Sequence, residues 1–216
     1  MKLHTKTLLT SLAAFAVAAG AHAATIVSYD FQTNADPTTE AANTSSNTVD
    51  GFGFSGDGRS SSSFSYFGRG PSTDPLTTYI SFTITADSGY QLDLDQLDFD
   101  YHFQQSQGVT TDKVAFEVRS SVDGFASAIP GTYEENPADQ STPLQAASLA
   151  LTGGSYDGLT SVEFRLYATN DTESIFNDIV RWDNIVVTGD APLVPEPGSL
   201  ALMGLGGLCV MRRRRK

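Results

Sequence analysis

The residues with the clearest chemical potential are four aspartates, Asp93, Asp95, Asp98 and Asp100, in a segment of alternating apolar side chains. If the segment is a strand, Asp98 and Asp100 lie on one side of it, about 7 Å apart. Carboxylates at that spacing could share a Ca²⁺ ion, although Ca²⁺ usually takes about 6–8 oxygens and the spacing is not that of an EF-hand loop. Two interpretations stay open: a structural calcium site at Asp98 and Asp100 or, preferred, solvent-facing aspartates that discourage association between sheet edges.

His102 is the only histidine outside the first 23 residues, so a Ser-His-Asp triad would have to use it. Alternation predicts that it points away from the core, because Tyr101 and Phe103 occupy the other face. The chain has no Gly-x-Ser-x-Gly motif to present a serine nucleophile. In so acidic a chain, some pair of carboxylates will match glycosidase spacing by accident. We therefore expect no catalytic residues and no enzymatic activity, with a glycan-active hydrolase as the least favoured alternative.

The single tryptophan, Trp182, could stack on a sugar ring, as could several tyrosines. Strict alternation puts Trp182 on the opposite side of its strand from Asp183 and Ile185. Trp182 is therefore either a ligand-binding aromatic or, preferred, a core or rim residue of the last strand.

The predicted elements are almost all strands. Segments 25–31, 79–85, 114–118, 162–166 and 179–188 have strand-like alternation or composition, and turns rich in Gly, Asp, Ser and Pro separate them. Between the runs at 92–94 and 97–103, Asp95 and Gln96 break the alternation, which predicts a turn or a bulge. With roughly nine short strands and no convincing amphipathic helix, the sequence predicts an all-β fold, a jelly-roll-like β-sandwich, over residues 24–190.

The N-terminal end has the pattern of a secretory signal peptide at residues 1–23. Lys2 and Lys6 precede an apolar stretch at 8–19, and Ala21 and Ala23 form a small-residue cleavage site. The mature chain should then begin at Ala24, after export by the Sec machinery.

The charge of the predicted exported domain excludes some partners. Between residues 24 and 193, six basic residues face 24 acidic ones, a net charge of −18. Such a surface repels nucleic acid and attracts cations, or it only keeps the protein soluble. The one cysteine, Cys209, lies outside this domain, which therefore has no disulfide and no thiol nucleophile.

The C-terminal end has three parts in a fixed order. Val194, Pro195, Glu196 and Pro197 come first, and their two prolines favour an extended, accessible break. An apolar run at 199–211 follows; as a helix it would be about 20 Å long, which is short for a hydrocarbon core of ~30 Å and suits a transient transmembrane anchor. The basic cluster Arg212, Arg213, Arg214, Arg215 and Lys216 ends the chain and should stay in the cytoplasm.

Residues 194–216 together resemble the PEP-CTERM sorting signal of Gram-negative bacteria, a type of tail also catalogued as "ice-binding protein, C-terminal". The resemblance implies that exosortase, a transpeptidase-like membrane protease, recognises Pro195, Glu196 and Pro197 and removes the tail near them. The alternative is an ordinary C-terminal membrane anchor. Neither the catalogue heading nor the single Thr83-x-Thr85 pair predicts ice binding. Residues 116–125 and 182–185 are also similar to parts of jelly-roll ectodomains that often precede this tail.

We therefore expect an exported protein, anchored transiently in the inner membrane and then released to the cell envelope, outer surface or extracellular matrix. The leading hypothesis for its domain is a structural or adhesive role. The alternative is a carbohydrate-binding jelly roll that recognises envelope polysaccharide and contains a structural calcium ion.

Overall fold

The computed structural model describes residues 24–104, 113–131, 133–135, 144–151, 153–171 and 178–194. The predicted signal peptide with Ala21 and Ala23 lies outside these residues. So do Pro195, Glu196, Pro197, the predicted transmembrane run at 199–211 and the basic cluster from Arg212 to Arg215. Among the described residues, no helix is both long enough and apolar enough to cross a membrane.

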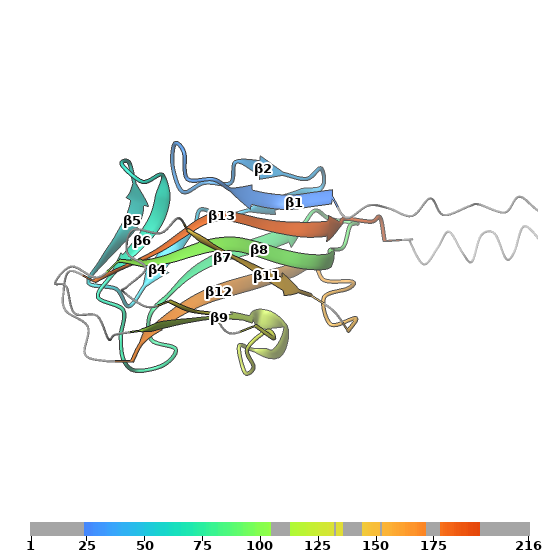
Figure 1. The fold of residues 1–216 in the computed structure, drawn as a ribbon. Helices are drawn as coiled ribbons and strands as arrows, with labels where there is room; N and C mark the ends of the chain where they lie inside the picture. The colour runs from blue at the N-terminus through green and yellow to red at the C-terminus, as the bar shows by residue number, and fades with distance from the viewer. Residues whose placement is uncertain are drawn as a thin grey trace, which may run out of the picture.

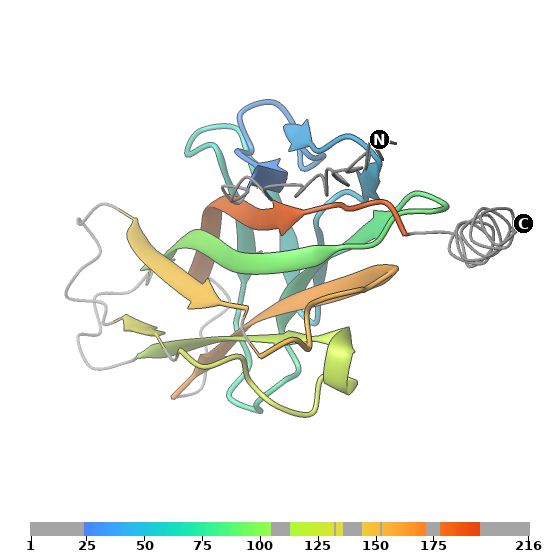
Figure 2. The ribbon, with the colours of Figure 1, turned by 90° about the vertical axis from the view of Figure 1, so that its right-hand side faces the viewer.

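Two antiparallel sheets form the molecule, and Figure 2 shows them as two layers. Sheet A contains β1 (Ala24–Tyr29), β2 (Thr39–Glu40), β5 (Gly56–Ser60), β6 (Ser65–Arg69), β8 (Asp93–Gln104), β11 (Gln145–Ala150) and β13 (Ile179–Asp190). Sheet B contains β3 (Thr44–Ser46), β4 (Asp50–Phe52), β7 (Tyr79–Ala86), β9 (Val114–Ser120), β10 (Tyr133–Glu135) and β12 (Ser161–Asn170). Outside the strands, the described helical structure is the single turn η1 (Ser121–Asp123). The prediction of an all-β sandwich is confirmed.

The core lies between the sheets because apolar residues alternate along the long strands. On β7, for example, Ile80, Phe82 and Ile84 are fully buried while their neighbours are partly exposed. Phe82 packs on Phe164 of β12 with ring centroids 5.6 Å apart. Burial of each such side chain contributes about 1.5–3 kcal/mol, which makes the alternation the main determinant of the fold.

Strand β13 is the centre of sheet A (Figure 1). It pairs along its length with β8, while on its other side its first half pairs with β6 and its second half with β1. From β7 to β13, every connection except β9–β10 passes from one sheet to the other. This crossing places strands from distant parts of the sequence side by side in sheet A.

A bulge in β13 changes which residues face the core. Asp183 lies opposite Asp100, but the next paired residue, Val186, lies opposite Asp98, so Asn184 and Ile185 share a single partner. Asn184 has φ 47°, a left-handed conformation that asparagine tolerates better than most residues. Trp182 and Ile185 are consequently both buried. The prediction that they lie on opposite sides was wrong, because alternation assumed a regular strand.

A second irregularity lies in β8, where Gln96 pairs with Thr188 but Leu94 pairs with Gly189. Asp95 is the extra, exposed residue, which lets both Leu94 and Leu97 face the core. The bulge predicted at Asp95 and Gln96 is confirmed.

Candidate functional site

The outer face of sheet A, which is turned away from sheet B, carries a row of three residues on neighbouring strands. Arg181 of β13 lies directly between Phe67 of β6 and His102 of β8. Direct partners on adjacent strands share a face, so the row places an aromatic ring, a guanidinium and an imidazole side by side. Arg69 and Gln104 flank the row two positions further along their strands. We call these five residues the Arg181 site.

Polar contacts hold the guanidinium of Arg181 in place. Its Nη1 donates to the hydroxyls of Ser63 at 2.6 Å and Ser65 at 3.4 Å, and its Nη2 donates to Oε1 of Gln104 at 3.0 Å. A surface cavity of about 230 Å³ lies beside it, lined by Ser63, Ser65, His102, Gln104, Leu144 and Arg181. Three donated bonds leave part of the five-donor fork for a ligand. The site is therefore oriented by the protein and open on one side.

The electrostatics of this site differ from those of sheet B. On sheet B, Arg119 bonds Glu117 at 2.6 Å and Arg165 bonds Glu163 at 2.7 Å. Within the described part of the chain, neither Arg69 nor Arg181 forms an ion pair with a carboxylate. Burial, and then the positive charge of Arg69, lower the pKa of Arg181 below its ordinary value. A pair of cations without carboxylate partners is suited to bind an anionic group.

Phe67 adds an apolar surface to this positive patch. The Cζ atom of Arg69 lies 5.6 Å from the centroid of the Phe67 ring, within the range of a cation–π contact. The ring is partly exposed on the outer face, next to Arg181. An aromatic ring beside two guanidiniums could hold the apolar face of an acidic sugar and its carboxylate together.

His102 lies on the outer face, as alternation predicted, but it is only 8% exposed and lines the cavity beside Arg181. The sequence offered no signal for the grouping of Phe67, Arg69 and Arg181, because β6 and β13 are more than a hundred positions apart in the chain. Only the long-range pairing of these strands brings the residues together.

Asp98 and Asp100, the candidate metal ligands, lie on the same outer face further along β8. Both carboxylate oxygens of Asp98 accept from Nε2 of Gln96, at 2.7 and 2.9 Å. Oδ2 of Asp100 accepts from Nδ2 of Asn184 at 2.7 Å. Among the described residues, no group of three or more His, Cys, Asp or Glu side chains is arranged to hold a metal ion. The structure therefore brings the two aspartates to one face and satisfies them with side-chain amides.

Trp182, the candidate sugar-stacking residue, is fully buried between the sheets. Its ring meets Phe54 and Phe116 edge-on, each at a centroid distance of 5.9 Å. No hydrogen-bond partner of its indole N–H is present in the described structure. A ligand on the surface cannot stack on a ring with no exposed area, so of the two interpretations Trp182 is the core residue, which was the preferred one, and is not a ligand-binding residue.

Sheet B has an aromatic strip on its own outer face. Phe52, 61% exposed, stacks on Tyr79 at 5.1 Å, and the Cζ of Arg165 lies 4.8 Å from Tyr79 and 3.7 Å from Phe125. The ring of Phe52 remains largely exposed, but Glu163 neutralises the guanidinium of Arg165. The strip fastens the loop after β9 to the sheet and, because its arginine is paired with a carboxylate, is less suited to an anionic group than the Arg181 site is.

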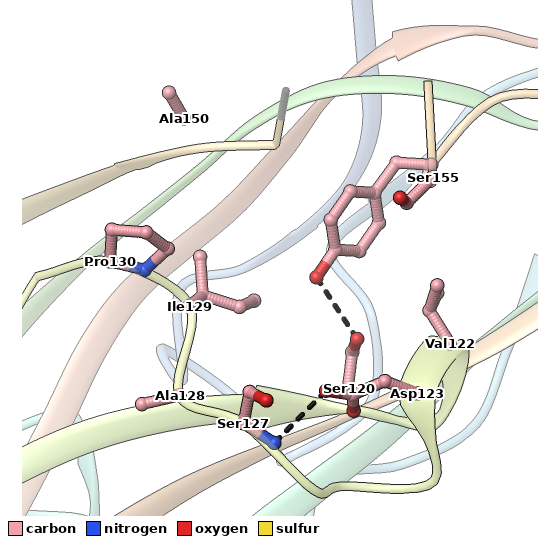
Figure 3. Close-up of a pocket in the computed structure, with 10 residues that line it drawn as sticks. Ser120, Val122, Asp123, Ser127, Ala128, Ile129, Pro130, Ala150 and Ser155 are labelled. Atoms are coloured by element: carbon pink, nitrogen blue, oxygen red, sulfur yellow. Dashed lines mark hydrogen bonds between the residues drawn. The ribbon is translucent and has the colours of Figure 1, made fainter. Parts of the chain in front are cut away.

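A further cavity, of about 230 Å³, lies beside η1, next to Ser120 and Tyr156 (Figure 3). The carboxylate of Asp123 accepts the backbone N–H groups of Ala126 at 3.1 Å and Ser127 at 2.9 Å. The hydroxyls of Ser120 and Tyr156 bond each other at 3.0 Å. Because its charged group caps the loop, this cavity offers mainly hydroxyls and apolar side chains, and we do not place the functional site there.

The geometry defines an all-β sandwich with two neighbouring arginines, Arg69 and Arg181, on the outer face of one sheet, and comparison with known proteins adds the sorting signal. Residues 193–216 match the family model of the PEP-CTERM protein-sorting motif. The chain carries this motif at its C-terminal end, which confirms the resemblance first found at Val194, Pro195, Glu196 and Pro197. The motif indicates an exported protein that is transiently anchored in a membrane and processed by exosortase. Among curated proteins, none matches the chain.

Solved structures with a similar arrangement of strands share little sequence with this chain. One is a carbohydrate-binding module, CBM28, specific for non-crystalline cellulose: 14% identity, 58% of this chain and 76% of that chain covered, TM-score 0.38. Another is the K3 cleaved adhesin domain of Lys-gingipain from Porphyromonas gingivalis W83: 16% identity, 77% and 100% covered, TM-score 0.41. A third is the CBM22-1 xylan-binding domain of Xyn10C from Paenibacillus barcinonensis: 11% identity, 79% and 97% covered, TM-score 0.41. At these values the likenesses carry no argument about ligand or role.

Proposed function

We propose that this chain is an exported adhesive module of the cell envelope or extracellular matrix, and that it binds acidic polysaccharide at the Arg181 site. The observation that carries the proposal is the guanidinium of Arg181, oriented by Ser63, Ser65 and Gln104 and without a carboxylate partner in the described chain. The domain has a net charge of −18, so its acidic residues already account for solubility, and solubility does not explain an arginine held in this way. A uronic-acid carboxylate matches the planar fork of arginine.

The position of the site fits a protein sorted through its C-terminal end. Arg181 is near the start of β13, and the sorting motif follows the end of this strand. Asp190 lies nine positions after Arg181 along the strand, a distance of about 30 Å. In Figure 1, β13 runs from the left end of the sandwich to the right end. A chain tethered at its C-terminal end would present the Arg181 site away from the membrane.

The proposal assigns binding and no reaction to the domain. Asp100 and Asp183 face each other on β8 and β13, and burial raises the pKa of Asp183 to about 6, so this carboxylate pair is the one we compare with a glycosidase pair. Asp183 is only 7% exposed, however, and neither aspartate lines the Arg181 cavity or the cavity beside η1.

We further propose that the strands have a jelly-roll-like connectivity, which the repeated crossing between the sheets supports. We also propose that the chain is exported by the Sec machinery and that it has no role in nucleic-acid binding.

The proposal is tested by co-sedimentation of the processed protein with polygalacturonate and with dextran, each with Ca²⁺ and with chelator. We expect saturable binding to the acidic polymer, weakened by added NaCl, and none to neutral dextran. Equal binding to both polymers would contradict recognition of the acidic group. No binding to either would leave a structural role as the better hypothesis. Loss of binding under chelator would support the alternative of a calcium-dependent site.

A further inference from the structure

The segment that leads into the sorting motif is paired to the turn between β7 and β8. Leu193 and Tyr90 form an isolated antiparallel bridge. The backbone N–H of Gln91 donates to the carbonyl of Pro192 at 3.0 Å, and the N–H of Val194 donates to the carbonyl of Gly89 at 2.8 Å. The family model begins at residue 193, so the folded domain holds the first two residues that the model matches.

The pairing is lightly held, because the side chains of Leu193 and Val194 are 65% and 41% exposed. Two backbone hydrogen bonds, with little apolar burial, keep the segment in place. The segment can therefore detach without unfolding the sandwich.

The pairing limits how far the folded domain can stand from a membrane. Val194 is five residues from the start of the apolar run at residue 199, a reach of at most about 17 Å. If residues 191–194 detach, the free chain starts at Asp190 and reaches about 30 Å. Residues 195–197 must enter a membrane enzyme within that span, and the longer reach separates the enzyme from the bulk of the sandwich.

We propose that the turn at residues 89–91 is a clip for the segment entering the sorting motif, and that exosortase processes the form in which this clip is released. The clip thereby sets the distance between the folded domain and the motif. This inference rests on processing by exosortase and is independent of polysaccharide binding, so either can fail alone.

The test is a disulfide that locks the clip. The hydrogen bonds flank the Tyr90–Leu193 pair rather than joining it, so the two residues form a non-hydrogen-bonded pair with Cα atoms about 4.5 Å apart, a separation that a disulfide can span. The full chain with Tyr90→Cys and Leu193→Cys, in a Cys209→Ala background, is expressed in cells that process the wild-type chain. Pulse-chase labelling then measures conversion of precursor to processed protein, and a gel shift after thiol alkylation verifies the disulfide.

We expect processing of the locked chain to slow about tenfold or more, and a reductant to restore it. Each single-cysteine variant should be processed at the wild-type rate, which separates the lock from any effect of Leu193 on recognition. Insertion of Gly-Ser-Gly-Ser between Val194 and Pro195 in the locked chain should also restore processing, because it replaces the lost reach. A locked chain processed at the wild-type rate would overturn the proposal, as would a locked chain that the insertion fails to rescue.

Discussion

Asp183 of β13 lies directly opposite Asp100 of β8, so that two carboxylates share the outer face of sheet A. Asp183 is 7% exposed, and its Oδ1 accepts the backbone N–H of Asn184 at 2.8 Å. Burial is the main reason that the pKa of Asp183 is raised from 3.8 to about 6, and the negative charges of Asp100 and Asp30 also raise it. The hydrogen bond from the backbone of Asn184 opposes the rise. The folded state therefore disfavours the charged form of this side chain.

The first prediction follows from this pKa. An acid whose pKa is higher in the folded state binds protons more tightly there, so its contribution to stability is greatest below about pH 4 and is lost as the pH rises through about 6. Asp183→Asn removes this titration. We predict that the melting temperature of the wild type, relative to that of Asp183→Asn, falls between about pH 5 and pH 7. Calorimetry of both proteins across that range measures it, and a difference that does not change with pH would contradict the assignment.

The second prediction concerns calcium. A Ca²⁺ ion at Asp98 and Asp100 would have to displace the amide of Gln96 from one and that of Asn184 from the other. It would also need about four or more further oxygens. We predict that millimolar Ca²⁺ leaves the melting temperature unchanged, in both the wild type and an Asp98→Asn, Asp100→Asn variant. A rise in the wild type alone would instead support the calcium site suggested by the spacing of the aspartates.

The parts of this structure that the sequence predicted depend on local patterns. Alternation identified the faces of β7 and β12 because their core residues follow one another at every second position. The sorting motif was recognised because its parts are consecutive in the chain. The relative sides of Trp182 and Ile185 were mispredicted because Asn184 adds a residue to the strand, and a bulge shifts every later side chain.

The Arg181 site could not have been predicted in the same way. Phe67 and Arg69 alternate in a short segment rich in Gly and Ser, and nothing local shows that this segment pairs with β13 rather than with another strand. That no carboxylate of the described residues pairs with Arg181 is equally a property of the assembled sheet. Long-range pairing, rather than residue spacing, creates the site.

The third prediction separates the structural role of Trp182 from ligand binding. Trp182→Ala leaves a cavity between Phe54 and Phe116 and should cost about 3–5 kcal/mol of the free energy of unfolding. Trp182→Phe should cost less, about 1–2 kcal/mol, because it keeps an aromatic ring and removes a buried N–H without a partner in the described structure. Urea unfolding measures both. Trp182→Phe should bind polygalacturonate as the wild type does, and a specific loss of binding would return Trp182 to the ligand site.

The last prediction tests Arg181 against an arginine of the opposite sheet. Arg181→Gln removes the cation and should weaken binding to polygalacturonate by about tenfold or more, as expected for a lost charge-assisted hydrogen bond. Arg181→Lys keeps the charge but loses the planar fork, so its affinity should lie between those of Arg181→Gln and the wild type.

Arg119→Gln is the matched control, because it removes the same charge from sheet B, where Glu117 already pairs it. Its binding should stay within about twofold of the wild type, since the guanidinium of Arg119 is already held by Glu117 and by the carbonyls of Phe125 and Ala126. Affinity is measured at low and high NaCl, and melting curves confirm that each variant is folded. If Arg119→Gln weakens binding as much as Arg181→Gln does, the polymer is responding to overall charge, and the site on β6, β8 and β13 is refuted.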